Sequence, residues 1–184
     1  MVTGPSGVGK GTLIRALIER SEGLELSTSA TTRAPRPGEE DGRDYHFLTR
    51  EQFDARLAAG EFLEHAEYAG NHYGTLRSEL ERRSRGVVLE IELQGARQVR
   101  RALPDAVQVF IEPPTPEALR ERLLARGSDA PEVIEARLAV AREELAAREE
   151  FEHRIVNDDL EGATAELFEL AASIGAVRAR GAPQ

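Results

Sequence analysis

The stretch Gly4-Pro5-Ser6-Gly7-Val8-Gly9-Lys10-Gly11-Thr12 has the spacing of a phosphate-binding loop. Such a loop aims successive backbone N–H groups at one phosphate chain, so it needs residues that permit positive φ angles and close approach. The following residues, Leu13 to Arg20, have a helical pattern, and the positive end of that helix is expected to face the same anion. Lys10 is then placed to reach the terminal phosphates.

The use of basic residues supports this interpretation. Lys10 is the only lysine among 24 basic residues, the rest being arginine. A compact ammonium is therefore kept at the one position where the planar guanidinium group of arginine does not fit. A glycine-rich turn before an amphipathic helix is the alternative, and it explains the glycines but not the lysine.

The loop departs from the usual pattern at one position. Ser or Thr usually follows the lysine and helps to hold Mg²⁺, but here that position is Gly11 and the hydroxyl comes one residue later, at Thr12. We therefore expect Mg²⁺ to be held mainly by nucleotide phosphates and water, with Thr12 or Glu90 reaching it at most through water.

Composition excludes several classes of protein. With 184 residues, 40% hydrophobic and 31% charged, the chain fits one soluble domain with a small insertion. It has no cysteine, so a disulfide, a thiolate metal site and a cysteine nucleophile are ruled out. A net charge of −9 argues against nucleic-acid binding, and there is no signal peptide or membrane-length apolar run, so we expect a cytoplasmic protein. Only Met1-Val2-Thr3 precede the loop, so the central first strand is expected to be truncated.

A proline- and glycine-rich stretch, residues 29–45, follows a short strand expected at 24–27 and carries Arg33 and Arg36. In a stiffened loop these arginines are suited to a bidentate grip on phosphate; an ordinary solvated polar loop is the alternative. Beyond it, residues 44–48 and 61–68 are predicted strands around a helix at 50–59. Residues 70–74 are a predicted turn, after which Thr75 caps a polar helix at 76–85.

The second half alternates strands and helices. Predicted strands cover residues 86–93, 107–111 and 154–157, the first one carrying Glu90 and Glu92 near its end, where acidic groups face Mg²⁺ and phosphates. Predicted helices cover 115–127, 131–151 and 163–174, and residues 176–184 are a frayed tail. The arginines of the first two helices fit either a charged surface or a lid that closes over phosphates.

This order of elements predicts an α/β fold with a parallel sheet flanked by helices. We divide the chain into a phosphate-loop kinase core at 1–30 and 84–184, with a helical lid within 115–150, and a small inserted mixed α/β domain for the substrate at 31–83. From the residues alone, the chain is predicted to be a nucleotide-dependent phosphoryl transferase.

Several stretches together resemble the guanylate kinases of bacteria. They are the phosphate loop, Ser29 to Glu39, Gly42 to Tyr45, Gly70 to Thr75, Ile91 to Gly95 and Ile155 to Asp158. Ser-Ala-Thr-Thr-Arg-Ala-Pro-Arg-Pro-Gly-Glu is far more specific than the loop, which many families share. The resemblance covers nearly the whole chain and implies that ATP and GMP are converted to ADP and GDP with Mg²⁺, in purine nucleotide metabolism.

The resemblance also implies the residues of the site. The inserted domain becomes the GMP-binding domain, with the GMP phosphate held by Arg33, Arg36, Tyr45 and Tyr73 and the guanine surrounded by Ser29, Glu64, Thr75 and Glu92. ATP is implied at Gly4, Pro5, Ser6, Gly7, Val8, Gly9, Lys10, Gly11, Thr12 and Asn157. The catalytic group is Lys10, Arg33, Arg126 and Arg137, the last two from the lid, and Glu90 resembles an acidic partner of the metal site. At Glu92 the family more often has Asp.

A carboxylate such as Glu64 accepts from guanine N1–H and the 2-amino group together, whereas adenine has no such pair of donors. Phosphoryl transfer needs charge neutralisation and in-line positioning, so no covalent enzyme intermediate and no essential general base are expected. Two alternatives remain open: a monophosphate kinase for another base, and a non-catalytic scaffold module related to guanylate kinase. The expected partners are ATP and GMP, with no nucleic acid and no membrane, in a monomer or homodimer.

Overall fold

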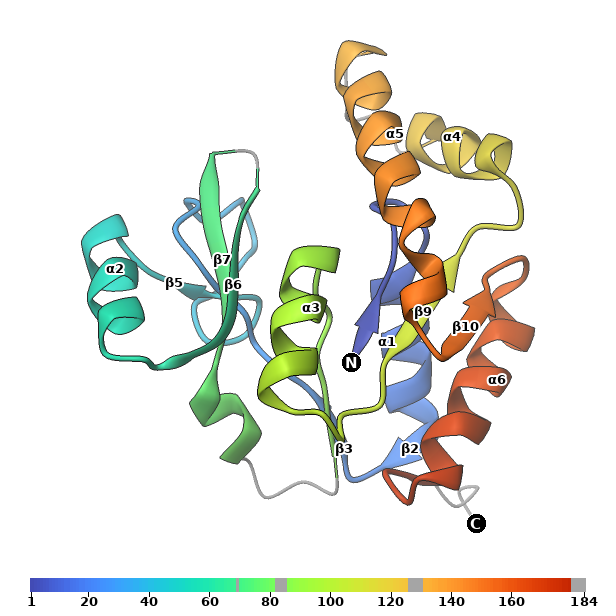
Figure 1. Ribbon diagram of the computed structural model, residues 1–184, viewed down its shortest axis with the longest axis horizontal. Helices are drawn as coiled ribbons and strands as arrows, with labels where there is room; N and C mark the ends of the chain where they lie inside the picture. The colour runs from blue at the N-terminus through green and yellow to red at the C-terminus, as the bar shows by residue number, and fades with distance from the viewer. Residues whose placement is uncertain (69, 82–85, 126–130, 180–184) are drawn as a thin grey trace.

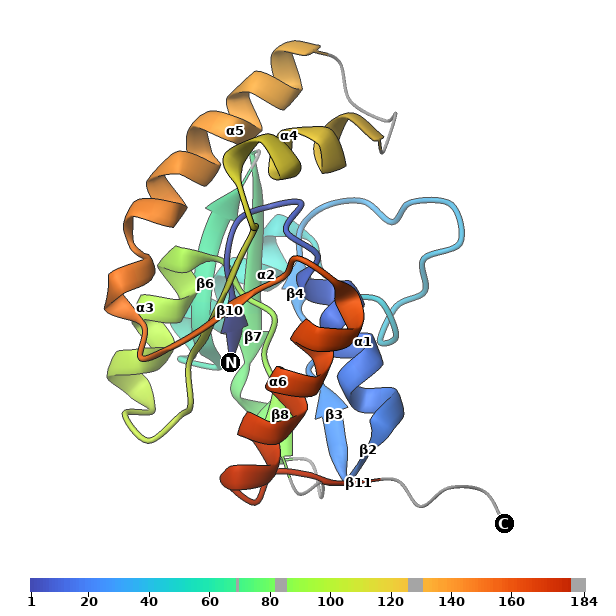
Figure 2. The same cartoon turned by 90° about the vertical axis from the view of Figure 1, so that its right-hand side faces the viewer.

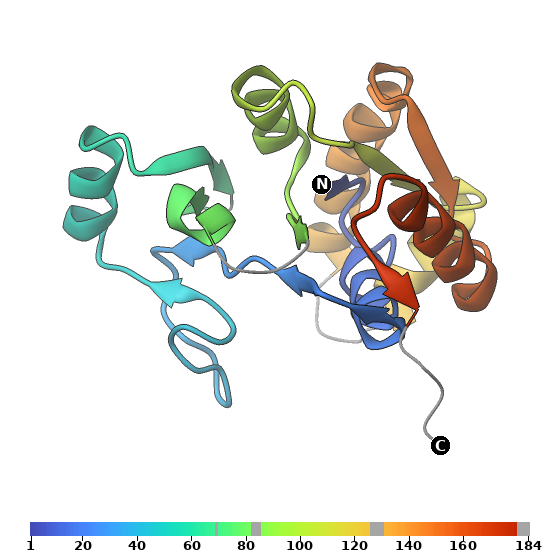
Figure 3. The same cartoon turned by 90° about the horizontal axis from the view of Figure 1, so that it is seen from below.

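The computed structural model describes residues 1–68, 70–81, 86–125 and 131–179 (Figure 1). Figure 3 shows two groups of elements side by side, one around a parallel sheet and one around a smaller sheet. Within the described residues no helix is long and apolar enough to cross a membrane.

The parallel sheet carries the phosphate loop at the end of its central strand. Strand β1 pairs with β9, which pairs with β10, all in parallel, with Val2 opposite Val109. On its other side β1 bridges to Glu90, just beyond β8, and the Val2 N–H donates to the Leu89 carbonyl over 2.8 Å. The spatial order is therefore β3-β8-β1-β9-β10. Its strands are β1 (Val2–Thr3), β3 (Leu24–Leu26), β8 (Gly86–Val88), β9 (Val109–Glu112) and β10 (His153–Val156).

Helices cover both faces of this sheet, because alternate residues of its strands point to opposite sides. Val109 and Ile111 of β9 join the core beneath α1 and α6, while Phe110 joins the core beneath α3, where its ring lies 5.1 Å from that of Phe151. The predicted α/β class with a flanked parallel sheet is confirmed. These helices are α1 (Lys10–Arg20), α3 (Leu93–Ala102) and α6 (Leu160–Ser173).

The smaller sheet has the strand order β5-β4-β7-β6, with β7 antiparallel to both neighbours. Helix α2 covers it: the Phe53 ring stacks on Phe62 at 4.3 Å. Thr49 and Gln52 form a capping box that fixes the start of this helix. The elements are β4 (Ala30–Thr31), β5 (His46–Phe47), α2 (Arg50–Ala58), β6 (Phe62–Tyr68) and β7 (Asn71–Leu76).

Two further helices, α4 (Pro116–Ala125) and α5 (Pro131–Ala146), lie above the phosphate-loop end of the parallel sheet (Figure 2). Leu119 and Leu123 of α4 are buried in the same core as Val8 of the loop. Arg120 and Glu135 join the two helices by an ion pair of 3.0 Å. Helix α5 then runs down to η2 (Arg148–Glu150), beside α3.

Three local predictions are wrong. Residues 71–76 form β7 rather than a turn and a capped helix, because their pairing with β6 places His65 opposite Gly74; only a short 3₁₀ helix, η1 (Arg77–Glu81), follows, and residues 82–85 lie outside the described residues. The strand predicted at 86–93 ends at Val88, and Leu93 already begins α3.

The tail predicted to fray is also structured up to residue 179. Val177 is buried in the main core, and β11 (Arg178–Ala179) pairs with β2 (Ser21–Glu22). An apolar side chain after a turn at Gly175, with a free strand edge beside it, ties this segment down.

Candidate active site

The phosphate loop wraps around the side chain of its own lysine. Lys10 Nζ donates to the Gly4 carbonyl over 2.6 Å and to the Pro5 carbonyl over 3.2 Å, and the side chain is buried. Gly4 has a φ of 140°, and a Cβ there would lie 2.3 Å from the Ile111 carbonyl oxygen, so only glycine fits. The loop leads into α1 through Gly9, whose φ is 100°. Backbone N–H groups, a helix N-terminus and an ammonium thus converge as an anion site requires.

Two side chains from beyond the loop hold its middle in place. The Asn157 amide Nδ2 donates to the Val8 carbonyl over 2.8 Å. Arg122 donates to the same carbonyl over 3.3 Å and to the Asn157 carbonyl over 2.8 Å. Asn157, predicted at the adenine, therefore lies against the loop itself. Arg122 was predicted only as a surface or lid arginine, since nothing in its helix pattern signals this contact.

Glu90 lies over the first turn of α1. A Cβ at Gly11 would lie 3.3 Å from Glu90 Oε2, so the glycine makes room for the carboxylate. Burial raises the pKa of the Glu90 carboxyl, while the positive charge of Lys10 lowers it. Thr12 is an exposed residue of the same helical turn. One carboxylate beside a phosphate loop suits Mg²⁺, which usually keeps several waters and binds through one or two carboxylates and substrate phosphates.

A cleft of about 420 Å³ opens between the two sheets, next to the loop. It brings together Ser6 of the loop, Arg137 of α5 and residues of the smaller sheet. Of the residues predicted from the sequence, Ser29, Arg36, Tyr45, Glu64, Tyr73, Glu90, Glu92 and Arg137 line it.

Glu64 lies buried in the wall of this cleft. The Thr75 hydroxyl donates to Glu64 Oε1 over 2.7 Å, and the Thr75 side chain is fully buried behind it. Burial raises the pKa of the Glu64 carboxyl, the Thr75 hydrogen bond lowers it, and the charge of Glu92 raises it again. Thr75 therefore orients Glu64 from within β7; its predicted role as a helix cap is wrong.

Gly95 of α3 makes room for Glu64. A Cβ there would lie 2.3 Å from Glu64 Oε2, closer than any real contact. A glycine in the first turn of a helix is visible in the sequence, but its purpose depends on a strand more than 25 residues away in sequence.

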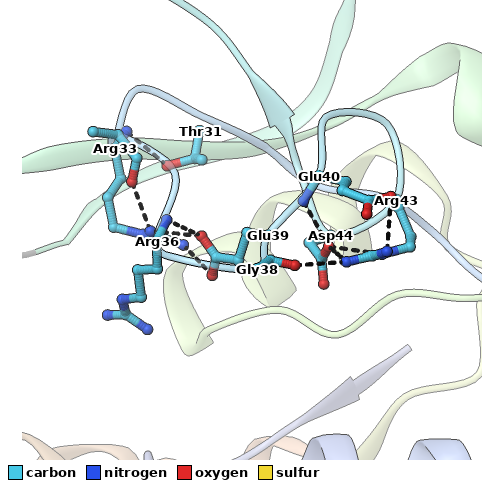
Figure 4. Close-up of polar contacts among 9 residues, drawn as sticks. Thr31, Arg33, Arg36, Gly38, Glu39, Glu40, Arg43 and Asp44 are labelled. Atoms are coloured by element: carbon cyan, nitrogen blue, oxygen red, sulfur yellow. Dashed lines mark hydrogen bonds and ion pairs between the residues drawn. The ribbon is translucent and has the colours of Figure 1, made fainter.

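Arg33 and Arg36, two of the three arginines in the 29–45 stretch, have different surroundings (Figure 4). Arg33 is gripped by both carboxylate oxygens of Glu39, over 2.9 Å and 3.0 Å, whereas the Arg36 guanidinium points away from that carboxylate in Figure 4. Glu39 also accepts from the Arg36 backbone N–H over 2.7 Å. The loop is thus ordered by Glu39, a residue quoted in the sequence pattern but given no role there.

Aromatic rings extend this cluster toward the cleft. The Arg33 guanidinium lies 5.2 Å from the Tyr45 ring centre, and the Tyr45 and Tyr73 rings meet edge-on at 6.2 Å. The Tyr73 hydroxyl lies near Arg33 and raises the pKa of that guanidinium, although less than Glu39 does. Arg33 itself does not line the cleft, while Arg36 does.

The sequence predicts two lid arginines. Arg126, predicted as a lid arginine, lies outside the described residues. Arg137 lines the cleft from α5. One acidic residue that the sequence did not single out, Glu144, is buried on the same helix and faces Glu92.

Comparison with known proteins gives one consistent result. Residues 1–173 match the family model described as guanylate kinase. The chain is 51% identical over 177 residues to the guanylate kinase of Thiobacillus denitrificans, covering 95% of this chain and 85% of that one. It is 52% identical over 173 residues to the guanylate kinase of Rubrobacter xylanophilus, covering 92% and 91%. Among solved structures, guanylate kinase from Anaplasma phagocytophilum matches with a TM-score of 0.76 and 32% identity, covering 95% of this chain and 85% of that chain.

Proposed function

The chain belongs to the guanylate kinase family and is an ATP:GMP phosphotransferase, and on this premise we propose how its own residues divide the transfer of the ATP γ-phosphoryl group to GMP. The observation that carries the assignment of roles is Glu64, a buried carboxylate beside the phosphate loop with one oxygen held by Thr75.

Glu64 reads the guanine. A carboxylate fixed by Thr75 and by the close approach of Gly95 accepts from N1–H and the 2-amino group of guanine. Adenine offers no such pair of donors. It would leave the buried Glu64 carboxylate unpaired and would therefore bind more weakly than guanine. Ser29 and Glu92 line the same cleft and complete the guanine surroundings.

Arg36, Tyr45 and Tyr73 hold the GMP phosphate. All three line the cleft, and arginine suits bidentate binding of phosphate. Arg33 does not line the cleft and contributes its charge from behind Tyr45 and Tyr73. Glu39 and the Tyr45 ring fix its orientation. The inserted domain at 31–83 is thus the GMP-binding unit, and 1–30 with 84–184 is the ATP-binding core.

The ATP phosphates bind to the loop from Gly4 to Thr12, kept in shape by Asn157 and Arg122. Lys10 places its ammonium where charge develops on the transferring group. Mg²⁺ held by the nucleotide phosphates and water, with Thr12 or Glu90 reaching it at most through water, would supply further charge neutralisation on the phosphate oxygens. Neither a covalent intermediate nor a general base is needed, because the chain's own groups position the two nucleotides and neutralise the charge on the transferring phosphoryl group.

The helices above the loop form the lid. Arg137 reaches the cleft from α5, and Arg126, by its place in the sequence, belongs to the same lid. Closure of the lid and of the GMP-binding unit excludes water and so prevents hydrolysis of ATP. We place the reaction in purine nucleotide metabolism and GMP recycling in the cytoplasm, carried out by a monomer or homodimer.

Glu64→Gln tests the guanine-reading role. The amide presents one donor where the carboxylate presents only acceptors, so one guanine contact becomes repulsive and KM for GMP should rise about tenfold to a hundredfold. KM for ATP should stay within about twofold, since the ATP phosphates are proposed to bind to the loop from Gly4 to Thr12 and not to Glu64.

The matched control is Glu67→Gln, an exposed position on the same strand. It removes the same charge and should leave both constants unchanged. An unchanged KM for GMP in Glu64→Gln would contradict the proposed guanine-reading role. A higher kcat/KM for AMP than for GMP in the wild-type enzyme would favour a kinase for another base.

A further inference from the structure

Glu144 is a carboxyl buried where the mechanism so far gives it nothing to do. It lies on α5, is 6% exposed, and its Oε2 has no hydrogen-bond partner among the described residues. Its carboxyl lies near the Glu92 carboxyl and the Ser6 backbone N–H, and Glu92 and Glu144 line one cavity of about 460 Å³. Through this side chain helix α5 therefore comes close to both the phosphate loop and Glu92.

Two neighbouring carboxylates, of which Glu144 is buried, cannot both be charged at low cost. Burial raises the pKa of the Glu144 carboxyl to about 8, and the charge of Glu92 and the hydrogen bond to it act in the same direction, while Lys10 and the Ser6 N–H oppose them. As two carboxylates, the pair has only acceptors, which leaves Oε2 without a partner. One proton on Glu144 turns the contact into an O–H donor and a carboxylate acceptor.

The position of Glu92 makes this contact relevant to substrate. Glu92 lines both the 420 Å³ cleft and an adjoining cavity of about 460 Å³ that Glu144 lines from the other side. Glu92 itself is exposed. Arg137 stands about two turns earlier on the same face of α5, and it lines the cleft with Glu92.

We propose that protonated Glu144 is a positioning residue, which donates a hydrogen bond to Glu92, accepts one from the Ser6 N–H, and so fixes the Glu92 carboxylate at the guanine end of the cleft. The inference rests on the proposed function, in which Glu92 belongs to the guanine surroundings. It also explains why Glu92, one methylene longer than the Asp expected from the resemblance, is held in a defined place. The base of α5, from which Arg137 reaches the cleft, is anchored by the same contacts.

Two substitutions at Glu144 separate hydrogen bonding from packing. Glu144→Gln keeps the shape, donates from its amide to Glu92 and accepts from Ser6, so it mimics the protonated carboxyl. Glu144→Met keeps the length and removes both hydrogen bonds. We expect KM for GMP to rise about tenfold in Glu144→Met and to stay within about threefold of wild type in Glu144→Gln. In both variants kcat at saturating GMP and KM for ATP should change by less than about threefold.

Glu143→Met is the matched control, because Glu143 is the exposed neighbour on the same helix. It should leave every constant at its wild-type value. Thermal unfolding of each variant with and without GMP shows that the compared proteins are folded.

The inference is overturned if Glu144→Met binds GMP as well as wild type, or if Gln and Met lower kcat alike with KM for GMP unchanged. A loss of the same size in Glu143→Met also overturns it. Failure of the proposed function looks different: the wild-type enzyme itself would then show no preference for GMP, whatever stands at position 144.

Discussion

Single residues of the phosphate loop show most directly how this chain prepares for a charged ligand. Lys10 Nζ is held by the Gly4 and Pro5 carbonyls, so the ammonium is oriented before any nucleotide binds. Less side-chain entropy then has to be lost on binding. The same ammonium lowers the pKa of Glu90 and opposes the upward shift at Glu144, which ties the acidic groups around the cleft to one positive charge.

Lys10→Ala is expected to lower kcat by about a hundredfold or more, because a preorganised charge at the transferring group is lost. GMP should still bind with a nearly unchanged Kd, since Lys10 does not line the cleft that holds GMP. Steady-state kinetics and calorimetric titration with GMP measure the two quantities. Lys10→Arg is the matched variant: it keeps the charge, and it too should lose most turnover if the pocket formed by the loop carbonyls admits only an ammonium. A parallel loss of GMP binding in Lys10→Ala would contradict these roles.

At this scale the sequence predicted residues that carry a recognisable pattern and missed those whose role depends on folding. Lys10 lies in the loop, and Arg36 and Glu64 line the cleft. Arg122, Gly95 and Glu144 act on partners far along the chain, for which helical spacing holds no information. Thr75, predicted both at the guanine and as a helix cap, lies in β7, and its hydroxyl points to Glu64 rather than capping a helix.

The elements of the fold bring these residues together by close approach of backbones. Helix α3 begins at Leu93 and passes so near to β6 that only glycine fits at position 95. The Glu64 carboxylate occupies the space that a side chain would fill. Gly95 has no side chain that could bind a ligand, but it fixes the position of Glu64, the residue proposed to read the guanine.

Gly95→Ala should raise KM for GMP at least about tenfold, because the new methyl group displaces the Glu64 carboxylate from its position. Alanine is a better helix former than glycine by about 1 kcal/mol, so the free energy of unfolding should not fall in proportion. Steady-state kinetics and thermal unfolding compared on the same variant check both parts. Unchanged KM for GMP together with lower stability would mean that Gly95 serves packing alone.

Strands and helices with regular patterns were predictable, and elements set by their neighbours were not. Helices α1, α2 and α6 begin and end near the predicted residues. The turn predicted at 70–74 rests on Gly70, Asn71 and Gly74, which are turn-forming residues, yet antiparallel pairing with β6 makes residues 71–76 a strand. The same holds for β11, which exists because β2 offers an edge.

On the scale of the whole molecule, acidic residues around the cleft form a group of carboxyls near one ammonium, that of Lys10. Burial raises the pKa of Glu64, Glu90 and Glu144, and each of these carboxyls also lies near the charge of Glu92. Folding brings these acids together, and the folded chain therefore keeps protons bound at pH values at which the unfolded chain has released them.

Stability should therefore fall as pH rises through the range in which Glu144 stays protonated only in the folded state. Its pKa is raised from 4.5 to about 8, so the folded state binds more protons than the unfolded state between these values, and the free energy of unfolding decreases with pH there. Glu144→Gln removes this titration. Its melting temperature relative to wild type should rise steadily from pH 5 to pH 8. An equal difference at both pH values would show that Glu144 titrates alike in the folded and unfolded chain.

The arrangement of the site as a whole predicts that the chain transfers phosphoryl groups to GMP and rejects monophosphates of other bases. The direct measurement is a coupled assay with Mg-ATP and the full chain, comparing GMP, AMP, UMP and CMP as acceptors. We predict turnover with GMP and at least about a thousandfold lower kcat/KM with each of the others, because only guanine satisfies the Glu64 carboxylate. Comparable or faster turnover with AMP, or no turnover by a chain that GMP stabilises against heat, would contradict this account.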